Sequence, residues 1–157
     1  MRKFLLITGL LWVMIACTTE TESLNEKTEF TPLKLEMENV VQSSVMAYGE
    51  LADSNDKLFV TIDDQLTWQN LLLQVHINQE LQPIDFDAST LVAVFDQTRI
   101  FGGFSIDIVE IIEYEQQVLV SIGRLNEEVG GITQAPTRPY HIVKIPKIDK
   151  PFVYTEL

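Results

Sequence analysis

Leu91-Val92-Ala93-Val94-Phe95 is an unbroken run of apolar residues in the second half of the chain. The run has the length of a β-strand and is too short for a helix, and Gln82-Pro83 interrupts any helical pattern before it. A strand whose successive side chains are all apolar must be covered on both of its faces. The run therefore predicts a buried strand at the centre of a sheet.

Further β-rich runs lie on both sides of this central strand. Phe104, Ile106 and Ile108 alternate with polar residues, and the apolar positions then shift from Val109, which indicates a bulge or bend. The other predicted strands are Leu33 to Ala47 with a break near Glu38-Asn39, Leu58 to Ile62, Val118 to Ile122, Tyr140 to Ile145 and Phe152 to Tyr154. A loop is expected from Gly130 to Pro139. Because short turns connect most of these runs, we expect an antiparallel sheet.

One segment has the periodicity of a helix. Asp63-Asp64 offers a negatively charged N-cap. The apolar residues that follow recur at intervals of three and four and form one helix face: Trp68, Leu71, Leu72 and Val75. The predicted fold class is therefore α+β, mostly antiparallel β, with a sheet or sandwich and one packed amphipathic helix.

The N-terminal segment, residues 1–16, has the features of an export signal. Arg2 and Lys3 precede the apolar stretch from Phe4 to Ile15, which is too short to span a membrane. The segment that ends at Cys17, Met14-Ile15-Ala16-Cys17, resembles the lipobox of bacterial lipoproteins. This resemblance implies cleavage before Cys17 and acylation of its sulfur, whereas an ordinary signal peptide would leave an unmodified thiol, a liability in an oxidising compartment. We expect a lipid-anchored protein of the cell envelope, with the outer membrane as its site.

The rest of the chain divides into a tether and one domain. Residues 17–31 are rich in Thr and Glu and contain too few apolar residues to fold, so we expect a solvated tether. Residues 32–157 suit a single globular domain. Without residues 1–16 the chain has 9 Lys and Arg against 23 Asp and Glu, a net charge of −14. This charge argues against nucleic acid and against flat contact with anionic lipid.

The inventory of reactive side chains argues against an enzyme. Cys17 is the only cysteine, and the histidines are His76 and His141. We expect His141 to be a structural histidine within a strand, since a catalytic role would require a cleft with a nucleophile beside it. Asp96 and Asp107 could form a carboxylate pair only around a cleft that the sequence does not indicate. We expect no catalytic residue, no metal and no cofactor.

Several motifs in the C-terminal half resemble a known family. The stretches that carry the resemblance are Phe101 to Ile106 (FGGFSI) and Thr133 to Pro146 (TQAPTRPYHIVKIP), preceded by Pro83-Ile84-Asp85-Phe86 and the helix around Trp68. In this order and spacing they resemble the C-terminal domain of the protease complex subunit PrcB. Phe101 and Phe104 stand where that family usually has Thr and Tyr. The resemblance implies a lipid-anchored accessory subunit that assembles with an extracytoplasmic protease or stabilises it.

Two segments are the candidate contact surface for such a partner. Gly102 and Gly103 could form a hairpin turn or bulge, or could flatten a spot flanked by Phe101 and Phe104 on which a peptide or strand docks. Arg138 stands beside a proline and an aromatic residue in an acidic chain, which is the setting of an interface anchor. The predicted partner-binding residues are Gly102, Gly103, Phe104, Arg138, Pro139 and Tyr140. The alternative is an envelope module that binds a peptide or glycan, with Trp68 or Tyr140 exposed around a pocket.

Overall fold

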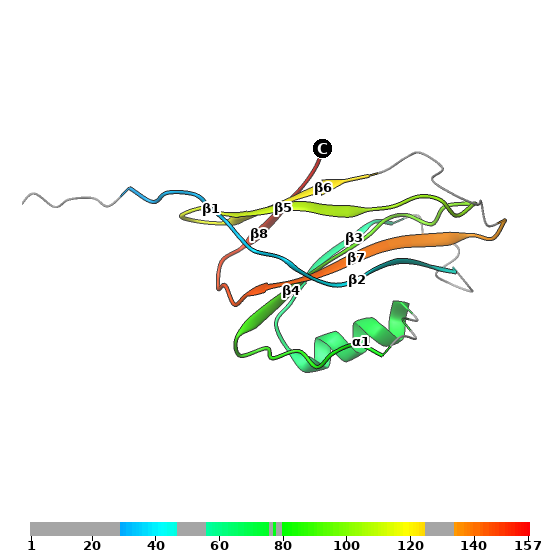
Figure 1. The fold of residues 1–157 in the computed structure, drawn as a ribbon, viewed down its shortest axis with the longest axis horizontal. Helices are drawn as coiled ribbons and strands as arrows, with labels where there is room; N and C mark the ends of the chain where they lie inside the picture. Colours follow the sequence, from blue (N-terminus) through cyan, green and yellow to red (C-terminus); the bar gives the residue numbers. More distant parts are fainter. Residues whose placement is uncertain (1–28, 47–55, 76, 78–79, 125–133) are drawn as a thin grey trace, which may run out of the picture.

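The computed structural model describes residues 29–46, 56–75, 77, 80–124 and 134–157. These residues form two packed four-stranded sheets and one helix (Figure 1). The outer sheet has the order β1 (Leu33–Lys34), β5 (Asp107–Glu113), β6 (Val118–Gly123), β8 (Phe152–Glu156). The central sheet has the order β2 (Glu38–Met46), β7 (Thr137–Pro146), β4 (Ser89–Phe95), β3 (Leu58–Ile62).

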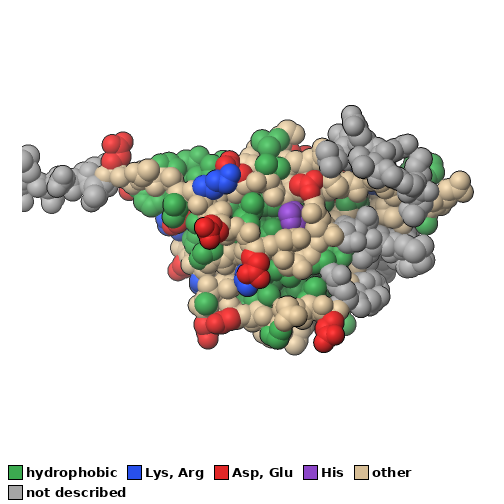
Figure 2. Space-filling model, in the orientation of Figure 1, with side chains coloured by type: hydrophobic (Ala, Val, Ile, Leu, Met, Phe, Trp, Pro, Cys, Tyr) green, Lys and Arg blue, Asp and Glu red, His purple; other side chains and the backbone are tan. Residues whose placement is uncertain are grey.

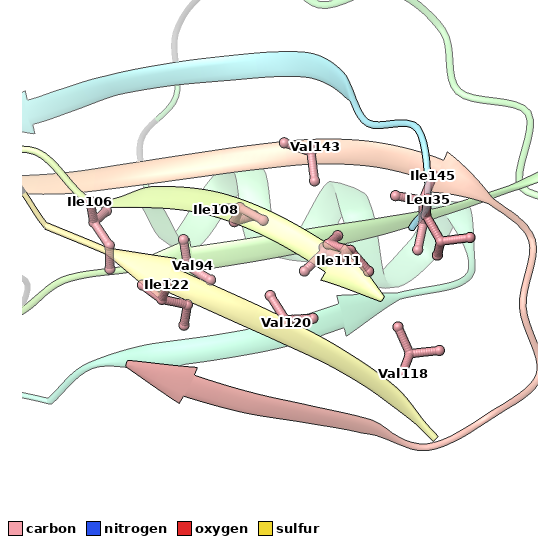
Figure 3. Packing of buried hydrophobic residues seen from close by; sticks show 11 residues of the cluster. Leu35, Val94, Ile106, Ile108, Ile111, Val118, Val120, Ile122, Val143 and Ile145 are labelled. Atoms are coloured by element: carbon pink, nitrogen blue, oxygen red, sulfur yellow. The ribbon is translucent and has the colours of Figure 1, made fainter. Parts of the chain in front are cut away.

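The central sheet is covered on both faces, as the apolar run at Leu91 to Phe95 predicts. Val92 and Val94 point into a cluster shared with the outer sheet, part of which is drawn in Figure 3. Leu91, Ala93 and Phe95 point to the opposite face and pack in a second cluster with the helix. All five side chains are completely buried. The prediction of a buried central strand is confirmed.

The helix α1 (Gln65–Val75) lies on the face of the central sheet that is turned away from the outer sheet (Figure 1). Asp64 caps its first turn, since the amide of Thr67 donates to Asp64 Oδ1 at 2.8 Å. Trp68, Leu71 and Val75 are buried against the sheet and Leu72 packs at the edge of the same cluster. The predicted helix and its apolar face are confirmed, and the fold class is α+β with mostly antiparallel strands.

Three details differ from the sequence-based expectation. The break in the first strand lies at residues 35–37, where the chain leaves the outer sheet and enters the central one, and a bulge follows between Asn39 and Val41. The strand predicted from Tyr140 already begins at Thr137. The last strand, β8, pairs with β6 in parallel, not antiparallel. The bulge expected near Val109 is present between Ile108 and Glu110.

Candidate protein-binding site

The two segments predicted to form one surface do meet, through the turn at residues 99–104 and the start of β7. The amide of Arg99 donates to the carbonyl of Thr137 at 2.7 Å, and the amide of Thr137 donates back to Arg99 at 2.9 Å. The Thr137 hydroxyl also donates to the carbonyl of Phe101 at 3.0 Å. Three hydrogen bonds therefore fix the turn to the central sheet.

The turn exposes two large apolar side chains. Ile100 is 75% exposed and Phe101 is 47% exposed. Gly102 behind them is buried, and Gly103 has a φ of 94°, a backbone conformation that favours glycine. The glycine pair therefore forms a turn, which is the structural one of the two interpretations of this motif. It coexists with an exposed apolar tip, because the same turn pushes residues 100 and 101 outward.

Phe104 lies on the inner side of the turn. It is half-buried, and the guanidinium carbon of Arg99 stands over its ring at 5.0 Å from the centroid. This cation–π contact occupies one face of the ring. Phe104 therefore supports the turn, and the aromatic residue available to a partner is Phe101.

Arg138, Pro139 and Tyr140 lie inside the protein, which corrects the expectation that they form an exposed surface. Arg138 is 5% exposed and Tyr140 is 3% exposed, and Pro139 is buried between them. Both side chains contact the Phe95 ring: the guanidinium carbon of Arg138 lies 5.6 Å from the ring centroid, and the centroid of the Tyr140 ring also lies 5.6 Å from it. A partner that approaches the folded domain cannot reach these side chains.

The position of Arg138 beside Pro139 has a structural reason. Phe95 pairs with Tyr140, so Asp96 is next in register with Pro139. The Asp96 amide donates to the Pro139 carbonyl at 2.9 Å, but proline has no N–H to return. Arg138 Nε donates to the Asp96 carbonyl at 3.0 Å instead. The arginine side chain thus replaces a missing ladder hydrogen bond in the middle of a sheet.

Asp96 is also the centre of an ionic network at this end of the sandwich. Its side chain is fully buried and binds Arg99 Nη2 at 2.6 Å and Arg124 Nε at 3.2 Å. Arg124 in turn binds Glu156 at 2.6 Å, and Lys57 binds the same carboxylate at 2.8 Å. The hydrogen bonds from Arg124, and then from Lys57, lower the pKa of Glu156 to about 2. The network ties the ends of β4, β6 and β8 together beneath the turn.

The residues considered for a ligand pocket or a catalytic site, Trp68, Tyr140 and His141, are buried in the domain. Trp68 is 4% exposed, so neither it nor Tyr140 can border a ligand pocket. His141 is buried, and its Nδ1 accepts a hydrogen bond from the amide of Ile108 at 3.0 Å. Among the described residues, no group of three His, Cys, Asp or Glu side chains could hold a metal ion. His76 lies outside the described residues.

A shallow hollow of about 360 Å³ lies at the other end of β7. Its charged lining residues are Glu36, Glu38 and Lys144, and Lys144 binds Glu38 at 2.7 Å. Among the described residues, no aromatic side chain lines the hollow, so the stacking platform expected of a glycan site is lacking there. Figure 2 shows acidic and basic side chains scattered among apolar ones over one face, not gathered in one charged patch.

No family model matches the chain, and neither a curated protein nor a solved structure matches it significantly. The resemblance to PrcB therefore depends on the quoted motifs. Within the part of the chain that the structure describes, no helix is long and apolar enough to cross a membrane.

Sequence reasoning found the turn and named Phe101 as one flank of a docking spot, but neither Ile100 nor Phe101 was among the predicted partner-binding residues. The signal was present, since Ile100 and Phe101 are two large apolar residues directly before a glycine pair. An arginine beside a proline and an aromatic residue is typical of an interface anchor. The same neighbours occur where an arginine side chain replaces the hydrogen bond that a proline cannot donate, as Arg138 does.

Proposed function

We propose that the protein is a lipid-anchored, non-catalytic accessory subunit of the cell envelope that binds a protein partner through the turn at residues 99–104. The observation that carries this proposal is the exposed pair Ile100 and Phe101 on a turn held by three backbone and side-chain hydrogen bonds. A rigid apolar tip loses little conformational entropy when it enters a pocket of a partner. Phenylalanine supplies the large apolar contact area typical of an interface core.

Sequence features support the anchor and the kind of partner. The lipobox-like segment before Cys17 supports lipidation, and residues 17–31 would separate the domain from the membrane. The motifs that resemble PrcB support an extracytoplasmic protease as the partner, which the subunit would assemble with or stabilise. The net charge of −14 favours standing away from anionic lipid, with the acyl chains as the only membrane contact.

The decisive experiment is an affinity purification of the full-length protein from detergent-solubilised membranes after crosslinking, with mass spectrometry of the copurified proteins. The test variant replaces both tip residues, Ile100→Ser with Phe101→Ser. The matched control is Leu73→Ser, because Leu73 is 76% exposed on α1 and equally apolar. We expect a stoichiometric extracytoplasmic protease with the wild type and the control, and its loss with the tip variant.

Two outcomes would overturn this proposal. A protease that remains bound to the folded tip variant would exclude the turn as the contact site. A wild-type protein that copurifies with no stoichiometric partner would exclude the accessory-subunit function. The anchor is tested separately with Cys17→Ser, which should abolish incorporation of a labelled fatty acid and release the protein from the membrane fraction.

A further inference from the structure

His141 joins the two sheets by a single hydrogen bond across the interior. It lies in β7 of the central sheet, and its Nδ1 accepts from the amide of Ile108 in β5 of the outer sheet at 3.0 Å. The residue is 8% exposed. Ile108 lies at the bulge of β5, where the pairing with β6 shifts register between Ile108 and Glu110. The imidazole therefore supplies an acceptor to a buried amide next to an irregularity of the sheet.

This hydrogen bond defines the protonation state of the ring. A backbone N–H can only donate, so Nδ1 must be unprotonated, and the neutral ring carries its proton on Nε2. A protonated ring would present N–H groups at both nitrogens and could not accept from Ile108. The bond between the sheets and the positive charge on His141 therefore exclude each other.

The groups around the ring do little to stabilise the charged form. Across the strands, Gln42 of β2 and Val94 of β4 are opposite His141, and neither titrates. The acidic neighbour is Asp107 at the start of β5, whose charge favours protonation. Its carboxylate already accepts hydrogen bonds from Gln42 Nε2 and from the Ser105 hydroxyl. Burial has the larger effect and lowers the pKa of His141 below its ordinary value.

We propose that His141 is an acid-sensitive latch between the two sheets, closed when the ring is neutral and opened when Nδ1 takes up a proton. Opening leaves the Ile108 amide without an acceptor and loosens the start of β5, which Ser105 and Ile106 connect to the turn at residues 99–104. The proposal concerns the stability of the sandwich and does not depend on the identity of a partner.

The direction of the pH dependence follows from the lowered pKa. Above about pH 6.5, the ordinary pKa of histidine, the ring is neutral in both states and the latch contributes its full stability. As the pH falls below this value, the unfolded chain binds a proton that the native protein does not. The unfolding equilibrium constant then rises about tenfold per pH unit, until the native ring is also protonated. Carboxylates titrate mainly below this window.

The test is urea unfolding of the full-length chain in detergent at pH 7.5 and pH 5.5, followed by tryptophan fluorescence. His141→Asn replaces Nδ1 with an amide oxygen that can accept from Ile108 but does not titrate. His76→Asn is the matched control, because it removes the other histidine. We expect the midpoints of the wild type and His76→Asn to fall in acid, and the midpoint of His141→Asn to change much less. Parallel falls in wild type and His141→Asn would overturn the proposal.

A second measurement on the wild type keeps the proposal testable if His141→Asn does not fold. Amide hydrogen exchange, corrected for the intrinsic effect of pH, is compared for peptides that contain Ile108 and peptides from β4. We expect protection around Ile108 to decrease severalfold between pH 7.5 and pH 5.5 while β4 remains protected. Equal protection of the Ile108 peptide at both pH values would show that no latch opens.

Discussion

The turn at residues 99–104 and the first residues of β7 are neighbours, yet one exposes apolar side chains to solvent and the other faces the core. Both contain aromatic residues beside glycine or proline, and both belong to the motifs that resemble PrcB. Ile100 and Phe101 are exposed, whereas Arg138 and Tyr140 are almost completely buried. The residue types do not decide this difference. The difference comes from the sheet. β7 begins at Thr137, so the residues after it pair with β4 inside the sheet and are covered by the domain.

Asp96 connects the two regions, and its replacement should have the largest effect. Its backbone pairs with Pro139 and Arg138, and its buried carboxylate binds Arg99 at the base of the turn. Asp96→Asn removes the buried charge that Arg99 and Arg124 share, although Arg124 keeps its pair with Glu156, and we expect a loss of about 3–4 kcal/mol of unfolding free energy. Urea unfolding measures it, with the exposed Asp87→Asn as control. A loss below about 1 kcal/mol would mean that the pairs behave as surface salt bridges.

Arg138→Ala should come next and would show whether this arginine is structural. It removes the donor to the Asp96 carbonyl and the cover over Phe95, and we expect a loss of about 2–3 kcal/mol, the upper range for a hydrogen bond to a charged group. Adding Pro139→Ala restores a backbone N–H opposite Asp96. The double variant Arg138→Ala, Pro139→Ala should therefore be more stable than Arg138→Ala alone in urea unfolding. A further loss on adding Pro139→Ala would contradict the replacement of the ladder bond.

Gly103 tests the rigidity of the turn. At a φ of 94° a side chain strains the backbone, so Gly103→Ala should cost about 1–3 kcal/mol, with a smaller loss for Gly103→Asn, since asparagine tolerates positive φ better. Thermal unfolding of both variants measures the difference. Equal stability of wild type and Gly103→Ala would indicate that the turn adopts another conformation in solution.

Phe101→Ala should have the smallest effect on stability. Nearly half of the side chain is exposed, and surface substitutions usually change the unfolding free energy by about 0.5 kcal/mol or less. Phe95→Ala in the neighbouring core is the contrast, with an expected loss of about 3–5 kcal/mol. Both are measured by urea unfolding. A loss for Phe101→Ala close to that for Phe95→Ala would place Phe101 in the core and remove it from the proposed contact surface.

Local patterns in the sequence predict much of this fold. The five apolar residues from Leu91, the helix face around Trp68 and the shift near Val109 are signals within single elements, and each is confirmed. The sequence does not reveal which strands pair, because pairing depends on contacts between distant segments. For the same reason the sequence does not predict that β8 is parallel to β6. The start of β7 is also missed, because Pro139 lies within it. A proline normally argues against a central strand, and only the structure shows the arginine that compensates for it.

The sequence predicts the turn of the candidate site but not which of its side chains are exposed, because exposure also depends on contacts with distant segments. The glycine pair indicates a turn from sequence alone, and Gly103 has the expected backbone conformation. Whether a flanking side chain is exposed depends on what packs over it. Arg99 covers Phe104 and leaves Phe101 open, and neither fact can be read from the spacing of the residues.

The position of β8 at the end of the chain and at the edge of the outer sheet has a consequence for biosynthesis. β6 lies between β5 and β8, and Glu156 at the end of β8 holds Arg124 directly after β6. The outer sheet therefore cannot be completed until the chain has been synthesised through residue 156. A chain is synthesised from its N-terminus, so β6 would have one edge unpaired until β8 has emerged from the ribosome. Such an edge is a template for aggregation, so a chaperone would be most needed in that interval.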